Sequence, residues 1–193
     1  WPVRCRASSD NSATVFSDSI NLTINDHPVA NISYPGSSQW LAGTVNINAS
    51  LSNDADGTIA NYFFQYDNNT AFSSPATICN GAVSNCTWNT SLQNQCENNS
   101  LSCYLRVTVT DDDGLTNSTY VTIGFDTQGP TVTLGLPAYF DNVTADTFSA
   151  DASAVDLESG VDTVFFEYRE NNSASWKSAC NDSSFTYQCL WNA

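Results

Sequence analysis

Acidic side chains crowd two short, turn-like stretches, and these are the residues whose type and spacing best fit a chemical role. Asp54 and Asp56 lie in one stretch, and Asp111, Asp112 and Asp113 follow one another in the second. Hard oxygen ligands at close range suit Ca²⁺, and three adjacent carboxylates repel one another unless they are solvated or neutralised. Because Asp and Gly also form turns without any ion, we favour the turn interpretation for either stretch alone. Calcium is the one metal cofactor that these residues suggest.

Groups suited to catalysis are sparse. His27 is the only histidine, so a Ser-His-Asp or Cys-His site could use no other, and its place at a boundary between two units favours a linker role. Glu158, Glu167 and Glu170 could supply the paired carboxylates of a glycosidase. Glu167, however, takes the place of Gln65 in the repeat described below, which indicates a strand position. We therefore expect no enzyme.

Tryptophans offer an alternative chemistry, a sugar-binding face. Two of the candidates, Trp88 and Trp191, follow a cysteine at the same spacing, which favours packing against a disulfide. Carbohydrate binding is therefore the less favoured hypothesis, with these candidates: Trp40, Trp88, Trp176 and Trp191.

The overall charge excludes one class of partner. The chain has 193 residues, 5 Lys+Arg against 20 Asp+Glu, and a formal net charge of −15. Neutralising phosphates requires Lys and Arg, so we expect no nucleic-acid partner. No run of about 18 apolar residues occurs, so we expect no transmembrane segment in this chain.

Acceptor sequences for N-linked glycans occur throughout the chain. There are eleven matches to N-x-S/T, about twice the number that this composition gives by chance. N-glycans attach outside the cytoplasm, so we predict an extracellular or cell-surface glycoprotein. The sites are Asn21, Asn31, Asn48, Asn68, Asn85, Asn89, Asn98, Asn117, Asn142, Asn171 and Asn181.

The seven cysteines agree with an oxidising compartment, because CxxC pairs that would suit zinc are absent. Four cysteines in the middle of the chain allow three connectivities. We expect Cys180–Cys189, since only these two lie in the last third. The matching Cys-x-Trp-Asn context then predicts Cys79–Cys86, which leaves Cys96–Cys103. Cys5 is the odd cysteine, for which an interchain disulfide and a buried thiol are equally open.

An internal repeat organises the sequence. PVANISYP at residues 28–35 recurs as PTVTLGLP at 130–137, and FFQY at 63–66 recurs as FFEY at 165–168. CTWN at 86–89 recurs as CLWN at 189–192, and VRCRA at 3–7 corresponds to LRVTV at 105–109. Several landmarks that keep one spacing of about 102 residues indicate a repeated structural unit.

The repeated unit is predicted to be a β-sandwich. Apolar residues alternate with polar ones around residues 45–49, 105–109 and 121–125, and large aromatics alternate at 62–66. Turn-rich stretches separate these runs. About 100 residues with about seven short strands indicate an all-β chain of tandem immunoglobulin-like β-sandwich domains.

The middle unit resembles a known family at this point. Residues 52–62, which read SNDADGTIANY, are similar to the S-x-D-x-D-G-x-I-x-x-Y signature of polycystic-kidney-disease-type (PKD) domains, and residues 107–116 are similar to that family's last two strands. The following unit resembles the Ig-like modules of prokaryotic surface proteins. The resemblance implies non-catalytic spacers, adhesins or coat components of extracellular surface glycoproteins.

The repeat divides the chain unevenly. Residues 1–26 correspond to the last two strands of a unit, 27–126 to a complete unit, and 127–193 to a unit without its last strands. We therefore predict a head-to-tail homopolymer, a filament or coat in which one chain completes the next by strand addition. The alternatives are a window of a long repeat adhesin, or a carbohydrate-binding or spacer module of an extracellular enzyme. The expected strand donors are Val3, Cys5, Ala7, Ile20, Leu22 and Ile24.

Overall fold

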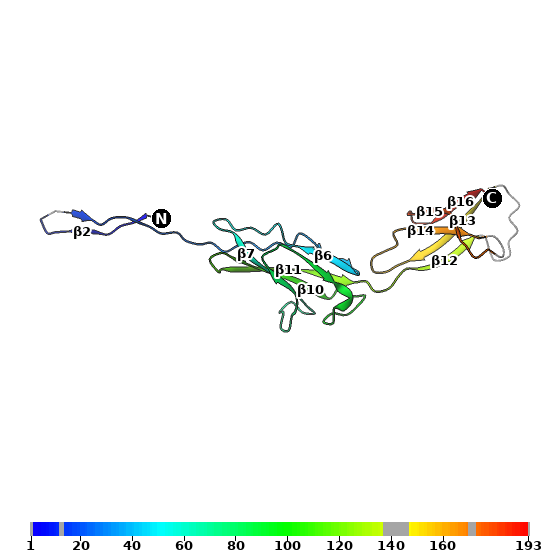
Figure 1. The fold of residues 1–193 in the computed structure, drawn as a ribbon, viewed down its shortest axis with the longest axis horizontal. Coiled ribbons are helices and arrows are strands. Elements are labelled where there is room, and N and C mark those ends of the chain that lie inside the picture. Colours follow the sequence, from blue (N-terminus) through cyan, green and yellow to red (C-terminus); the bar gives the residue numbers. More distant parts are fainter. Residues whose placement is uncertain (1, 12–13, 137–146, 170–172, 193) are drawn as a thin grey trace.

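The computed structural model describes residues 2–11, 14–136, 147–169 and 173–192, and it is an all-β structure, which confirms the expected fold class. Figure 1 shows its three parts in a row along the longest axis. The N-terminal part holds β1 (Pro2–Val3), β2 (Arg6–Ser8), β3 (Thr14–Phe16) and β4 (Ile20–Asn21). The middle part holds β5 (Gln39–Leu41), β6 (Thr44–Asn48), β7 (Ile59–Asp67), β8 (Ala76–Gly81), β9 (Asn85–Asn89), the 3₁₀ helix η1 (Thr90–Leu92), β10 (Cys103–Asp111) and β11 (Thr116–Phe125). The third part holds β12 (Thr131–Leu136), β13 (Thr147–Val155), β14 (Val164–Tyr168), β15 (Lys177–Asp182) and β16 (Gln188–Asn192).

Within the described ranges, no helix is long and apolar enough to cross a membrane.

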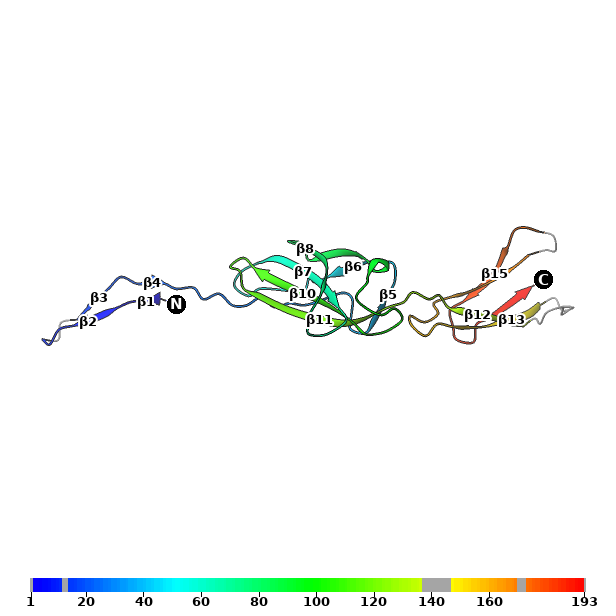
Figure 2. The same cartoon turned by 90° about the horizontal axis from the view of Figure 1, so that it is seen from below.

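The middle part is a two-layer sandwich (Figure 2). One sheet has the strand order β5-β11-β10-β7-β8, and the other pairs β6 with β9. Strand β5 runs parallel to β11, whereas the other pairs are antiparallel. Alternation in the sequence decides which side chains turn inward, because successive residues of a strand face opposite sides. Leu105, Val107 and Val109 on β10 are fully buried, and Arg106 and Thr108 between them are not.

Aromatic rings fill the centre of this sandwich. The Trp88 ring on β9 meets Phe125 edge-on at 5.4 Å between centroids and lies 4.9 Å from the Tyr66 ring. Such tilted and edge-on contacts are the favoured arrangements of aromatic pairs. Trp88 is therefore a core residue that joins the two sheets.

The third part repeats the strand pairings of the middle part. It has one sheet of order β12-β13-β16 and a second that pairs β14 with β15. The pairing of β6 with β9 corresponds to that of β13 with β16. In the first, Val45 pairs with Trp88 and Ile47 with Cys86. In the second, Phe148 pairs with Trp191 and Ala150 with Cys189. Phe64 pairs with Cys79, as Phe166 pairs with Cys180, and a register irregularity follows that residue in both parts.

Three disulfides link the strands, and they are the expected pairs: Cys79–Cys86, Cys96–Cys103 and Cys180–Cys189. The first and third connect the two sheets of their sandwiches, because each joins a strand of one sheet to a strand of the other. In the entropic model, each short loop closed in this way contributes on the order of 2–3 kcal/mol. Cys5 is exposed and forms no disulfide within the described residues.

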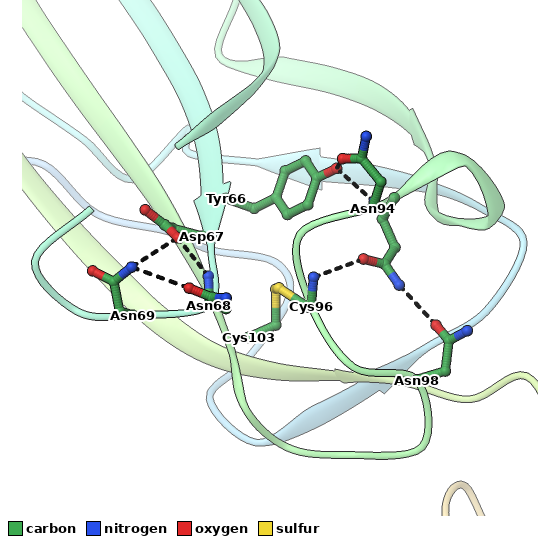
Figure 3. The surroundings of a disulfide bond; sticks show 9 residues. Tyr66, Asp67, Asn68, Asn69, Asn94, Cys96, Asn98 and Cys103 are labelled. Atoms are coloured by element: carbon green, nitrogen blue, oxygen red, sulfur yellow. Dashed lines mark hydrogen bonds between the residues drawn. A yellow bond between two sulfur atoms is a disulfide. The ribbon is translucent and has the colours of Figure 1, made fainter. Parts of the chain in front are cut away.

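Figure 3 shows the surroundings of the Cys96–Cys103 disulfide. The backbone N–H of Cys96 donates to Gln93, and the Gln93 amide donates to Asn98 Oδ1 at 2.7 Å. Asp67, which is buried, accepts hydrogen bonds from the backbone N–H groups of Asn68 and Ser74. Because these polar groups are satisfied within the loops, the loops at this end of β7 and β10 have a defined geometry.

Gly124 allows Trp40 to lie against strand β11. A Cβ added there would stand 2.5 Å from Trp40 Cε3, whereas a Cβ added at Gly81 on β8 would meet nothing within 4 Å. We expect Gly124→Ala to lower the free energy of unfolding by about 1–3 kcal/mol through overpacking. Gly81→Ala is the matched control, with little change expected. Urea unfolding followed by tryptophan fluorescence measures both, and equal stability of the two variants would show that Trp40 moves without cost.

Candidate functional site

Among the described residues, the histidine and the tryptophans considered for catalysis and sugar binding lie at separate places. His27 is exposed, with Nδ1 3.1 Å from the carbonyl oxygen of Thr116, so it connects the linker to β11. Trp88 is in the core and Trp40 lies against Gly124. Trp176 is exposed in the third part, where its ring lies 4.8 Å from the guanidinium of Arg169. The Trp191 side chain and all of Glu170 lie outside the part that the structure describes.

The N-terminal part is an exposed pair of strands that stands apart from the sandwiches (Figure 1). Strand β1 pairs with β4 and β2 with β3, both antiparallel, so residues 2–11 and 14–21 form one interrupted hairpin. We call it the N-terminal hairpin and include the following residues up to Ile24. The expected strand donors all lie in it and are all exposed: Val3, Cys5, Ala7, Ile20, Leu22 and Ile24.

The N-terminal hairpin has the register of the β10–β11 hairpin. Its Val3 pairs with Ile20 and its Ala7 with Val15. Val109 and Asn117, 102 residues after Ala7 and Val15, pair in the same way, and Leu105 pairs with Val121, which lies 101 residues after Ile20. Between these two pairs the second strand of the hairpin has one residue more than β11, and otherwise the pairings correspond. Around Cys5, two hydrogen bonds to Ser17 hold the strands together between β1–β4 and β2–β3. The hairpin is therefore formed as the last two strands of a unit, but without the sheet that buries them.

Among its described residues, the third part lacks a counterpart of the β10–β11 hairpin. Strand β7 pairs with β8 on one edge and with β10 on the other. Its counterpart β14 pairs with β15, and no strand among the described residues pairs with its second edge. The unpaired N–H and C=O groups of such an edge are a template for another strand. We call this the β14 edge.

The core of the third part is open on the same side. A groove of about 270 Å³ lies between β12 and β14 and is lined by apolar side chains, Val132, Leu134 and Phe166 among them. Val132 and Leu134 are 65% and 60% exposed, whereas the corresponding Ala30 and Ile32 pack against the closed core of the middle part. In the middle part, the inward side chains of β10 and β11 belong to that closed core. Figure 2 shows the β14–β15 pair diverging from the other sheet.

Charges on the outer face of the two elements are complementary. In the middle part, Arg106 Nη2 donates to Gln65 Oε1 at 2.6 Å between paired strands. The corresponding residues are Arg4 in the N-terminal hairpin and Glu167 on β14. The Arg106–Gln65 pair within the middle part thus corresponds to an oppositely charged pair, Arg4 and Glu167, between the hairpin and the β14 edge. A hydrogen bond between two charged groups is stronger than one with a neutral partner. The pair was missed from the sequence because its members lie far apart, although the repeat alignment contains it.

The acidic residues that are candidate calcium ligands lie together at the end of the middle part that faces the N-terminal hairpin. Asp111 is 2% exposed, and its carboxylate accepts hydrogen bonds from the backbone N–H groups of Asp113 and Leu115 and from the Asn25 amide. The pKa of Asp54 is raised by burial and by the neighbouring carboxylates Asp56 and Asp111. That of Asp112 is lowered because the backbone N–H of Thr58 donates to its carboxylate.

A second acidic cluster was not found from the sequence. Carboxylate oxygens of Asp126, Asp156 and Glu158 lie within 4.8 Å of one another, where the middle part joins the third. Its signal was present in the repeat, because Asp156 and Glu158 stand 102 residues after Asp54 and Asp56.

The glycan acceptor sites lie mainly on the surface. Asn48 is half-buried, and its side chain accepts a hydrogen bond from the backbone N–H of Ser50. Asn142 and Asn171 lie outside the described residues. Asn85 and Asn89 are exposed even though Cys86 and Trp88 beside them are buried, because alternate residues of β9 face opposite ways. The exposed sites are Asn21, Asn31, Asn68, Asn85, Asn89, Asn98, Asn117 and Asn181.

No protein-family model matches the chain, and no curated protein sequence matches it. Among solved structures, it is similar to the PKD1 domain of Vibrio anguillarum Epp, with 23% identity and a TM-score of 0.36 over 53% of this chain and 98% of that domain. It is also similar to a structure described as a carbohydrate-binding module of the β-sandwich superfamily with promiscuous specificity. There the identity is 18% and the TM-score 0.38, over 79% of this chain and 51% of the other. The β-sandwich architecture is established by the sheets of the chain itself.

Proposed function

We propose that the chain is a non-catalytic, structural glycoprotein subunit of an extracellular filament or coat, assembled head to tail by strand addition. The N-terminal hairpin of one copy would add to the β14 edge of a second copy. The observation that carries the proposal is the shared register. The hairpin pairs as β10 and β11 pair, apart from one additional residue in its second strand, and the third part has the strands that receive such a pair, but no described strand pairs with the β14 edge.

The pairing between copies follows from the middle part. There, Leu105, Val107 and Val109 pair with Tyr66, Phe64 and Tyr62. Between copies, Cys5 would pair with Phe166 and Ala7 with Val164. The side chains that correspond to the donors are fully or largely buried in the middle part. Docking would therefore remove apolar surface of both partners from water, which is the main favourable contribution to association.

Two copies are required because the donor and the acceptor of one chain lie at opposite ends of the molecule, with the middle sandwich between them (Figure 1). The two surfaces differ, so the contact is heterologous. Such contacts propagate into an open filament unless the rotation closes a ring. Strand addition by further residues of a longer chain, as in a repeat adhesin, would use the same edge, and the experiments below distinguish the two.

The predicted register is tested by a disulfide between copies. In a Cys5→Ser background, Ala7→Cys with Val164→Cys places the new thiols at a paired position, where Cα atoms are close enough for a disulfide. We expect a ladder of linked chains on non-reducing gels. The matched control is Ala7→Cys with Phe165→Cys, since Phe165 is 67% exposed and is the next residue along β14. Absence of a ladder, or equal ladders for both, would contradict the proposal.

A charge exchange tests the same contact independently. Arg4→Glu alone and Glu167→Arg alone each place like charges across the interface, and we expect each to weaken association by roughly fivefold or more. Mixing the two variants brings opposite charges together at every contact, so assembly should return. Sedimentation velocity measures all three samples. A mixture no more assembled than either variant would show that these residues do not meet.

An extracellular location accounts for the glycan acceptor sites and agrees with the three disulfides. We expect glycan at most exposed sites and the lowest occupancy at Asn48, whose side chain is half-buried and hydrogen-bonded. Peptide mass spectrometry of native material, with and without enzymatic deglycosylation, measures the occupancy of each asparagine. Bare asparagine at most exposed sites would overturn the glycoprotein assignment.

A further inference from the structure

The acidic cluster of the middle part contains a carboxylate that the protein alone does not satisfy. Both oxygens of Asp54 have less than 1 Å² of exposed surface, and neither has a hydrogen-bond partner among the described residues. Burying a charged group without a partner is costly. An unpartnered carboxylate surrounded by other carboxylates therefore indicates a bound cation.

The neighbouring groups converge on the same place. A Cβ at Gly57 would stand 2.7 Å from Asp54 Oδ2 and 2.5 Å from Asp112 Oδ1, so carboxylate oxygens from two loops approach this glycine. The linker reaches the same cluster, because the backbone N–H of Asp26 donates to Asp56 Oδ2 at 3.0 Å. The cluster thus combines the β6–β7 loop, the β10–β11 turn and the linker from the N-terminal hairpin. We call it the first junction cluster.

The corresponding position in the third part carries the same kind of residues. Asp156 and Glu158 replace Asp54 and Asp56, and Asp126 lies in the linker that precedes the third part, as Asn25 lies in the linker that precedes the middle part. Asp126, Asp156 and Glu158 form the second junction cluster, with Asp126 Oδ2 accepting a hydrogen bond from Ser159. The counterpart of the Asp111–Asp113 turn is absent from it within the described residues.

We propose that a hard divalent cation, Ca²⁺ by its all-oxygen donors, binds at the first junction cluster, and that Asp10 of a neighbouring copy completes an equivalent site at the second. The second half of this inference rests on the proposed function. Asp10 lies at the tip of the N-terminal hairpin and corresponds to Asp112, which borders Asp54 at the first cluster. Strand addition in the register given above carries that tip to the second cluster of the next copy.

The choice of Ca²⁺ follows from the donor set. Carboxylate oxygens carried on loops and turns suit the variable coordination of Ca²⁺, whereas Mg²⁺ requires near-ideal octahedral geometry. A site built from two loops and a linker fixes the angle between consecutive parts. A site that is complete only when a second copy is docked couples cation binding to assembly, so that each raises the affinity of the other.

Calorimetric titration of the 193-residue chain with Ca²⁺ tests both sites, using assembled protein and the Arg4→Glu variant at a concentration at which sedimentation velocity shows it to be unassembled. Assembled protein should bind at two sites. Asp54→Asn should weaken the first by at least about tenfold, since even changes beyond the direct ligands cost 10–100-fold in metal affinity. The matched control Asp162→Asn removes an exposed carboxylate outside both clusters and should leave both sites intact.

Asp10→Asn separates the two halves of the inference. It should weaken the second site in assembled protein and raise the Ca²⁺ concentration needed for assembly, but it should change nothing in the Arg4→Glu background. A chain that binds no Ca²⁺ at millimolar concentration, or an Asp54→Asn variant that binds as the parent does, would overturn the first site. Polymers that form equally well in EDTA and with Asp10→Asn would overturn completion between copies and leave strand addition intact. No assembly under any condition, with Ca²⁺ still bound through Asp54, would refute the proposed function and retain the first site.

Discussion

The central aromatic strand of each sandwich requires a hydrogen-bonded neighbour on both edges, and the rest of the structure depends on this requirement. Strand β7 meets it with β8 and β10, and the pairing with β10 brings Val107 opposite Phe64 and closes the core. Within the part of the chain that the structure describes, strand β14 meets it on one edge only. Val132 and Leu134 are exposed, and among the described residues no counterparts of the β10 and β11 side chains cover them. The β14 edge and the open core of the third part are thus two sides of the same structural feature. One added hairpin of the right register would pair with the edge and cover the core.

The sequence predicted the fold where local pattern and packing agree. Alternation in residues 105–109 and 121–125 identified β10 and β11, because a strand with one buried face has a period of two. It did not predict the parallel pairing of β5 with β11, since Gln39–Leu41 is too short to carry a pattern and its partner lies far along the chain. Nor did it predict that Asp111 is buried. The backbone N–H groups and the Asn25 amide that stabilise this carboxylate become neighbours only in the folded protein.

The residues of the candidate site could be predicted from the sequence where they correspond to residues of another repeat. The donor residues followed from the alignment of residues 3–7 with 105–109, and the structure adds that the hairpin already has the matching register. Asp54 and Asp56 were identified by type and spacing, but the second acidic cluster was missed. Asp126 is separated from Asp156 and Glu158 by a whole hairpin, so only the fold brings these carboxylates together. Spacing along the chain identifies ligands from one loop and fails for ligands from several.

The shared register of the N-terminal hairpin and the β10–β11 hairpin has a consequence for the form of an assembly. A hairpin that fits the third part also matches the place that β10 and β11 occupy in the middle part. The hairpin of another copy would therefore compete with β10 and β11 for that place. The resident strands are attached to their own sandwich, which gives them a local concentration that free chains do not reach. In the proposed assembly, the hairpin of another copy would therefore be excluded from the middle part, and each molecule would offer one acceptor site, the β14 edge. Chains with one donor hairpin and one acceptor edge would form unbranched filaments. A higher protein concentration would then give longer filaments rather than a denser network.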